Sequence, residues 1–143
     1  MTQEEKQLLL KDLCARVPYG VKVHVGDDWA MTLRQIDYKC FCECWENEYL
    51  KNNSRWMLPY LRPMSSMTEE EREELEHLSE EYFGKALDKQ IQESLSSSNR
   101  NESKILECIA SSVIVDWLNA HHFDFRGLIE KGLALEAPEG MYK

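Results

Sequence analysis

The sequence lacks a long apolar run, a secretion signal and an excess of basic residues. No apolar stretch reaches the roughly 18 residues that a membrane-crossing helix needs, so no membrane association is expected. The first residues, Thr2-Gln3-Glu4-Glu5, are unlike a signal peptide, and we expect a cytoplasmic protein. Asp and Glu number 26 against 17 Lys and Arg, a net charge of -9. A chain this acidic has no broad basic face to release counterions from a phosphate backbone, so direct nucleic-acid binding is not expected.

The cysteines are odd in number: Cys14, Cys40, Cys42, Cys44 and Cys108. Without a secretion signal, reduced thiols are expected. Alternation places the sulfurs of Cys40, Cys42 and Cys44 on one face of a predicted strand. There the Cα atoms of Cys40 and Cys44 would lie about 13 Å apart, whereas two thiolates on one zinc ion lie at most about 4.6 Å apart. Core packing is therefore preferred and no metal is expected, and metal or redox chemistry stays open only if this stretch is a loop.

The chain begins with a predicted helix over about residues 3–16. Thr2 with Glu5 is a capping-box pattern, in which the hydroxyl and the carboxylate each accept from an otherwise unpaired amide. Pro18 and Gly20 end the helix. Its core-facing side chains are expected to be Leu9, Leu10, Leu13 and Val17.

A hairpin is predicted next, around a turn at residues 26–28. Its apolar side chains alternate with a period of two, at Val21, Val23, Val25, Trp29, Met31 and Leu33. Lys22 and His24 belong to the other face. A third strand is expected over about residues 36–45 and a short fourth near 56–60. The result is a small antiparallel sheet, for which closure into a barrel stays open.

The second half of the chain is predicted to be mainly helical. Thr68 with Glu71 is a second capping box, and apolar residues continue at helical spacing to about Leu95. Gly84 weakens the middle of this stretch, so division into two helices stays open. A last long helix is expected over about residues 102–119, with an apolar face wide enough to pack on more than one side.

The end of the chain completes the predicted fold. Residues 125–131 fit one or two helical turns that end at Gly132, and Pro138 and Gly140 predict a tail. The fold class is therefore α+β, in a single domain of residues 1–143. A helix and a small sheet occupy residues 1–63, and a mainly helical half, residues 64–143, packs on them.

One candidate catalytic set lies near the end of the last helix: His121, His122 and Asp124, with Asp116 nearby. Histidine with a carboxylate can bind a metal ion or act as a general base. Adjacent histidines on a helix, however, point about 100° apart. Imidazolium at a helix end also interacts favourably with the carbonyl dipoles. A structural role is therefore preferred to a catalytic one.

A second candidate is an anion pocket just before a helix start, made of Arg62, Ser65, Ser66 and Thr68. The glutamates at residues 69–71 follow at once and would repel an anion. Helix capping by Thr68 is therefore preferred.

The acidic stretch from Thr68 to Glu81 is the third candidate, with eight acidic residues and one arginine. Such a run is most often a solvated helix face. The alternative is an electronegative surface that mimics nucleic acid or binds a basic protein. Glu70, Glu73 and Glu80 are its candidate interaction residues.

Three segments carry a family resemblance: residues 11–21, from Lys11-Asp12-Leu13-Cys14-Ala15-Arg16 into Pro18-Tyr19-Gly20-Val21, residues 59–71, and residues 116–142. Together they resemble a group of small uncharacterised proteins encoded by phages, prophages and related mobile elements of gut Bacteroidales. Residues 27–54 and 75–106 depart from the pattern of that group. The resemblance implies a mobile-element setting inside a Bacteroides-type host cell, and it carries over no catalytic residue.

These features favour a non-catalytic protein that acts through protein contacts in the host cytoplasm. The expected partner is a host or phage protein with a basic surface, because the chain itself is acidic. No cofactor is expected. The alternative is a small metal-dependent enzyme, or a His/Asp-based one, built on His121, His122 and Asp124.

Overall fold

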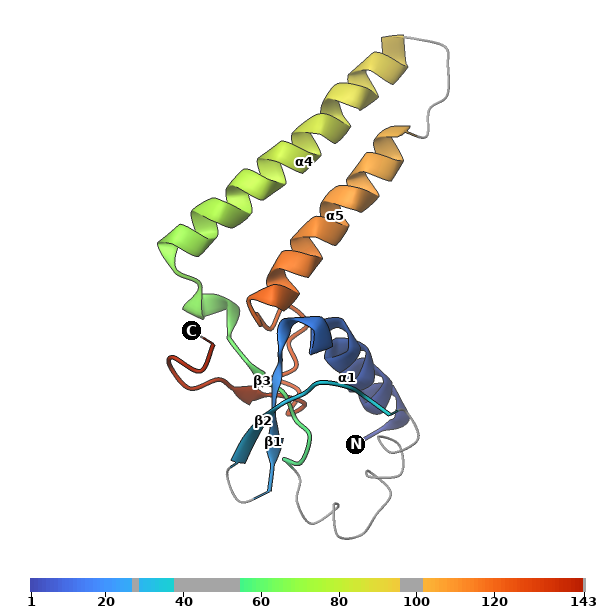
Figure 1. Ribbon diagram of the computed structural model, residues 1–143. Coiled ribbons are helices and arrows are strands. Elements are labelled where there is room, and N and C mark those ends of the chain that lie inside the picture. The colour runs from blue at the N-terminus through green and yellow to red at the C-terminus, as the bar shows by residue number, and fades with distance from the viewer. Residues whose placement is uncertain (27–28, 38–54, 96–101, 143) are drawn as a thin grey trace. The chain divides into compact units, whose positions relative to one another are not determined.

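The computed structural model describes residues 1–26, 29–37, 55–95 and 102–142 (Figure 1). The chain divides into two compact units. The first unit comprises Met1–Met64 and Asn119–Lys143, and the second comprises Ser65–Leu118. The predicted α+β class is confirmed by the order of helices and strands. The predicted third strand lies outside the described residues except for Ile36 and Asp37, which are not in a strand, and Cys40, Cys42 and Cys44 lie outside them too.

Helix α1, Gln3–Arg16, has the predicted bounds, and its capping box is confirmed. The Thr2 hydroxyl accepts from the Glu5 amide at 3.1 Å, and the Glu5 carboxylate accepts from the Thr2 amide at 2.6 Å. Leu9 and Leu13 are fully buried, whereas the other two predicted core residues of this helix, Leu10 and Val17, are partly buried. A short 3-10 helix, η1 (Val17–Tyr19), ends at Gly20 with φ 71° and leads into the first strand.

Strands β1 (Lys22–Val25) and β2 (Trp29–Thr32) form the predicted antiparallel hairpin, with Val23 opposite Met31. Val21, Val23 and Leu33 are buried at one end of its apolar face. The apolar alternation does not bury the other end, because Trp29 is 75% exposed and Met31 is 52% exposed. His24, on the opposite face, is buried.

The predicted fourth strand is only partly right. Residues 55–57 form a turn, and strand β3 is Tyr60–Leu61. It pairs in parallel with β4, Leu135–Glu136, near the C-terminus. The amides of Leu135 and Ala137 donate to the carbonyls of Pro59 and Leu61, both at 2.8 Å. This pairing precedes the predicted tail, which begins at Pro138. The described residues contain two two-stranded sheets and no closed barrel.

The second unit contains helix α4 (Glu69–Leu95) and most of helix α5 (Glu102–Ala120), which run in opposite directions (Figure 1). The capping box of Thr68 and Glu71 is confirmed, with bonds of 2.9 and 3.2 Å. Helix α4 is continuous through Gly84. Burial on α5 is uneven, because Ile109 is 45% exposed whereas Trp117 is 8% exposed.

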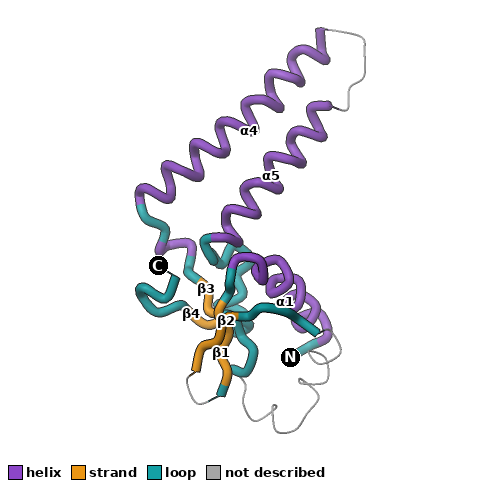
Figure 2. The backbone as a smooth tube through the Cα atoms, viewed as in Figure 1, coloured by secondary structure: helices purple, strands orange, loops and turns teal. Residues whose placement is uncertain are grey.

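After α5 the chain folds as turns, and the predicted helical turns over residues 125–131 are only partly right, because no helix is assigned there (Figure 2). Gly127 has φ of 68°, which a right-handed helix does not accommodate, whereas Gly132 ends the turns as predicted, with φ of 70°. The Leu133 amide closes the turns by donating to the Leu128 carbonyl at 2.8 Å. This segment completes the core of the first unit, whose buried members are Leu9, Leu13, Val21, Val23, Leu33, Leu58, Leu61, Leu128, Leu133 and Ala134.

Candidate functional site

The candidate histidines lie in the turn that follows α5. His122 has φ of 60°, and its amide donates to the Asn119 carbonyl at 3.1 Å. A positive φ is uncommon for a residue with a Cβ atom, and it reverses the chain here where glycine often ends a helix. The His122 carbonyl accepts from the Arg62 amide at 2.8 Å, which ties the turn to the chain just after β3.

Asp124 is committed to the backbone rather than to the histidines. One carboxylate oxygen accepts from the Leu128 amide at 2.8 Å, and the other accepts from the Ile129 amide at 2.9 Å. The side chain is buried, so these bonds to a charged group stabilise the turns strongly. Asp124 therefore has a structural role in these turns.

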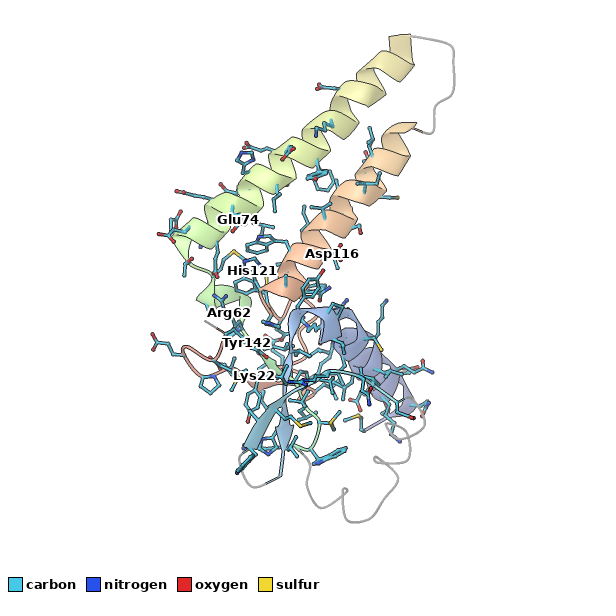
Figure 3. The ribbon with its side chains drawn as sticks, in the orientation of Figure 1. Lys22, Arg62, Glu74, Asp116, His121 and Tyr142 are labelled. Carbon is cyan, nitrogen blue, oxygen red and sulfur yellow. The ribbon has the colours of Figure 1, made fainter. Side chains whose placement is uncertain are left out.

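The two histidine rings contact different aromatic rings. The His121 ring stacks on Phe123, with centroids 6.5 Å apart and planes 19° apart. The His122 ring stacks on Tyr142, with centroids 3.7 Å apart and planes 20° apart. His121 and Tyr142, both labelled in Figure 3, belong to the first unit. The two histidine rings therefore stack on different partners, and the carboxylate of Asp124 bonds to backbone amides.

His122 is held in its neutral form at neutral pH. Its pKa is lowered to about 4, first by burial and then by the positive charges of Arg16, His121 and Arg62. A hydrogen bond with the backbone of Tyr19 acts in the opposite direction. A group with so low a pKa is a poor general base at pH 7, because its basicity is too weak for efficient proton abstraction.

Tyr142 is the residue that sequence reasoning missed most completely. Its hydroxyl accepts from the Lys22 amide at 2.9 Å and donates to the Tyr60 carbonyl at 2.7 Å (Figure 3). Burial raises the pKa of this phenol to about 12. A tyrosine inside the predicted tail gives no sequence signal for such a contact, because its partners lie far away along the chain.

The Tyr142 hydroxyl takes the place of a backbone hydrogen bond between two strands. Val23 and Pro59 form an antiparallel bridge, so Lys22 is opposite Tyr60 in that register. On one side of the bridge the His24 amide donates to a carbonyl of the facing chain at 2.9 Å. On the other side, where an antiparallel ladder would bond Lys22 directly to Tyr60, the phenol oxygen bridges them instead.

A buried ionic network adjoins this region. Arg16 donates through Nε to one oxygen of Asp12 at 2.9 Å, and Arg126 donates to the other at 2.6 Å. Arg16 also donates through Nη2 to the Phe123 carbonyl at 2.7 Å. Asp12 and Arg16 are fully buried. The sequence held a signal for this pair, since both lie on the helix face of Leu9 and Leu13 at i, i+4 spacing.

Two buried polar atoms in this interior have no hydrogen-bond partner among the described residues: Arg16 Nη1 and His122 Nδ1. Burying an unpaired polar atom is costly. For His122 the consequence is specific, because a second proton on the ring would sit on an atom with no acceptor beside it.

Two residues of the predicted anion pocket, Arg62 and Thr68, contact other groups of the chain. The Arg62 guanidinium lies over the Phe123 ring, 4.3 Å from its centroid. Thr68 makes both bonds of the capping box at the start of α4. Thr68 therefore caps helix α4, as the preferred interpretation of the sequence predicts.

The acidic stretch forms an exposed face of α4. No side chain between Glu69 and Lys85 is buried, and Glu70, Glu73 and Glu80 are all exposed. A shallow hollow on this face is lined by Glu73, Glu76, His77, Glu80 and Glu81. Lys85 pairs with Glu81 at 3.4 Å, both side chains being largely exposed, so this ion pair neutralises little of the face.

The described part of the chain contains no preformed metal-binding site. No group of three or more His, Cys, Asp or Glu side chains there could hold an ion. Cys14 and Cys108 are exposed free thiols. The metal-free state expected of Cys40, Cys42 and Cys44 remains a prediction, which metal analysis of protein purified without an affinity tag would check.

Comparison with known proteins assigns no relative. No family model, curated protein or solved structure matches the chain. Within the described residues, no helix combines the length and apolar character needed to span a bilayer.

Proposed function

We propose that this chain is a non-catalytic protein that binds a partner through the acidic face of α4. The observation that carries the proposal is the exposure of this face, where eight acidic residues meet one arginine between Thr68 and Glu81. A helix in which no side chain from Glu69 to Lys85 is buried contributes little to a core. Its charge instead suits recognition of a protein with a basic surface.

The contacts of the candidate catalytic residues support a non-catalytic role. Asp124 uses both carboxylate oxygens on backbone amides. His122 is buried under Tyr142, and its pKa of about 4, lowered chiefly by burial, makes it a weak base. These arrangements stabilise the fold and make neither Asp124 nor His122 a good general base, so the enzyme alternative built on them is not favoured.

The proposed setting is the cytoplasm of a bacterial host that carries a phage or mobile element. It rests on the resemblance of residues 11–21, 59–71 and 116–142 to small proteins of such elements. The proposed partner is a host or phage protein with a basic surface, because the acidic face would attract it and repel nucleic acid.

Charge reversal on α4 tests the proposal. The variant Glu70→Lys, Glu73→Lys, Glu80→Lys should lose a basic protein that the wild-type chain captures from host lysate and that binds it in a purified two-component assay. The matched control is Glu4→Lys, Glu130→Lys, Glu139→Lys, which changes the net charge equally at exposed positions of the first unit. Glu70 lies in the first turn of α4, so its reversal alone should cost only about 0.3–1 kcal/mol of helix stability.

The outcome separates specific binding from net charge. Loss of the partner in the α4 variant and retention in the control supports the acidic face as the contact. Equal loss in both variants means that net charge alone drives the capture. Equal binding by the α4 variant and the wild type means that the helix is a solvated face, and the proposal is then wrong.

A further inference from the structure

The C-terminal segment is attached to the first unit at two places. The inner attachment is β4, with backbone bonds from Leu135 and Ala137 to the chain around β3. Beyond it, residues 138–140 are exposed. The outer attachment is Tyr142, whose hydroxyl bridges Lys22 and Tyr60. Tyr142 therefore ties the outer part of the segment to the first unit.

Tyr142 also covers His122. Their rings stack with centroids 3.7 Å apart, and His122 is 5% exposed. The charged and titratable groups that act on the His122 ring are Arg16 from α1, His121 from the end of α5, and Arg62 from the chain after β3. All three are basic. The described residues supply no acceptor for a proton on Nδ1.

We propose that residues 138–142 form a pH-sensitive clasp, which closes through Tyr142 over neutral His122 and opens when His122 is protonated. The neutral ring stacks on the phenol without a desolvated charge. The imidazolium form would be repelled by the positive charges of Arg16 and Arg62, and its Nδ1 proton would have no acceptor among the described residues. Attraction between imidazolium and the Tyr142 ring opposes opening, but it is worth little beside burial of a charge. Opening lets water reach the ring and exposes the Lys22 amide and the Tyr60 carbonyl.

The direction of the pH effect follows from linkage. Burial is the main cause that lowers the pKa of closed His122 to about 4, from 6.5 for the unperturbed group. The free energy that favours the closed clasp is therefore at its full value above about pH 6.5, and it decreases as the pH falls toward 4. If opening restores the unperturbed pKa, the opening equilibrium at pH 5 should be up to about 30-fold larger than at pH 7.5.

Hydrogen exchange at the Lys22 amide reports on the clasp directly, because that amide donates to the Tyr142 hydroxyl. In the full chain, its protection factor should fall up to about 30-fold from pH 7.5 to pH 5, after correction for intrinsic exchange. The amides of His24 and Leu33 donate to backbone carbonyls in the same region and serve as references. Their protection should stay unchanged while that of Lys22 falls.

Three variants sharpen the test. His122→Asn removes the titrating ring and tolerates the positive φ, so Lys22 protection should no longer depend on pH. His121→Asn is the matched control and should keep the dependence. Tyr142→Phe keeps the ring but removes the hydroxyl, so Lys22 should lose protection at both pH values.

Two results would overturn the clasp. One is persistence of the pH dependence in His122→Asn. The other is joint loss of protection at Lys22, His24 and Leu33, which would mean that the whole unit opens. If His122→Asn does not fold, an NMR titration of His122 decides. Its pKa should rise toward 6.5 in Tyr142→Ala, and an unchanged value would also refute the proposal.

Discussion

Arg16 donates through Nε to the carboxylate of Asp12, one turn earlier on α1, at 2.9 Å, and both side chains are fully buried. Arg126 and the Phe123 carbonyl complete the network from the other end of the chain. A buried ion pair contributes less net stability than its geometry suggests, because both charges have lost their hydration. It does tie the N-terminal helix to the C-terminal turns at a defined position. Removing one partner has a much larger effect than the pair's net contribution.

Asp12→Ala should therefore lower the free energy of unfolding by about 3–5 kcal/mol, since it leaves Arg16 charged and unpaired in the interior. Urea unfolding at pH 7 measures the loss. The matched control is Glu81→Ala, which breaks the exposed ion pair with Lys85 and should cost less than about 1 kcal/mol. Similar midpoints for Asp12→Ala and the wild type would show that the network is not formed in solution.

Asp124→Ala should cost about 2–4 kcal/mol, because two backbone amides lose a charged acceptor in a buried turn. His121→Ala, in the same segment, loses a ring contact with Phe123 and no bond to these two amides, and should cost about 1 kcal/mol or less. Thermal melts of the two variants compare these losses. A larger loss for His121→Ala would contradict the assignment of Asp124 as the residue that holds the turns.

Stability should depend on pH through His122. Its folded pKa of about 4, lowered mainly by burial, is below the unfolded value of 6.5, so the unfolded state binds the proton more readily. The contribution is present above about pH 6.5 and is lost as the pH falls toward 4, by up to about 3 kcal/mol. Urea midpoints between pH 7.5 and 4.5 should fall less steeply in His122→Asn than in the wild type. Parallel curves would assign the acid sensitivity to other groups.

Trp117→Ala should cost about 3–5 kcal/mol, because Trp117 is 8% exposed and its truncation leaves a large cavity. Ile109→Ala on the same helix is the matched control. Its side chain is 45% exposed, and we expect a cost below about 1 kcal/mol. Circular dichroism melts of both variants measure the difference. If the two melt alike, Trp117 is not part of a packed core in solution.

Local features of the fold were predictable from sequence because their causes are local. The bounds of α1 and both capping boxes follow from residues three positions apart, as Thr2 with Glu5 shows. The hairpin follows from its period of two. The predicted helical turns after Asp124 are only partly right, since the positive φ of Gly127 interrupts a helix there, whereas Gly132 ends the turns as predicted.

The candidate site was harder to predict because its partners are distant in sequence. Strands β3 and β4 have two residues each, which is too few for a periodic signal in the sequence. They pair although most of the second half of the chain lies between them in sequence. Tyr142 acquires its role only because that pairing brings it to Lys22 and Tyr60. Tertiary packing likewise buries Asp12 beside apolar neighbours, although hydropathy alone would turn it toward water.

By itself, the sequence determined the charge of -9, the acidic face of α4 and the helices whose capping groups lie within one turn. These depend on composition, which no conformation changes, and on groups so close along the chain that they can meet without help from distant segments. Only the tertiary structure decided that His122 stays neutral, that Arg16 is buried and that a phenol oxygen takes a place in a strand ladder. Each of these depends on desolvation and on partners far apart in sequence, and these conditions exist only once the chain has folded.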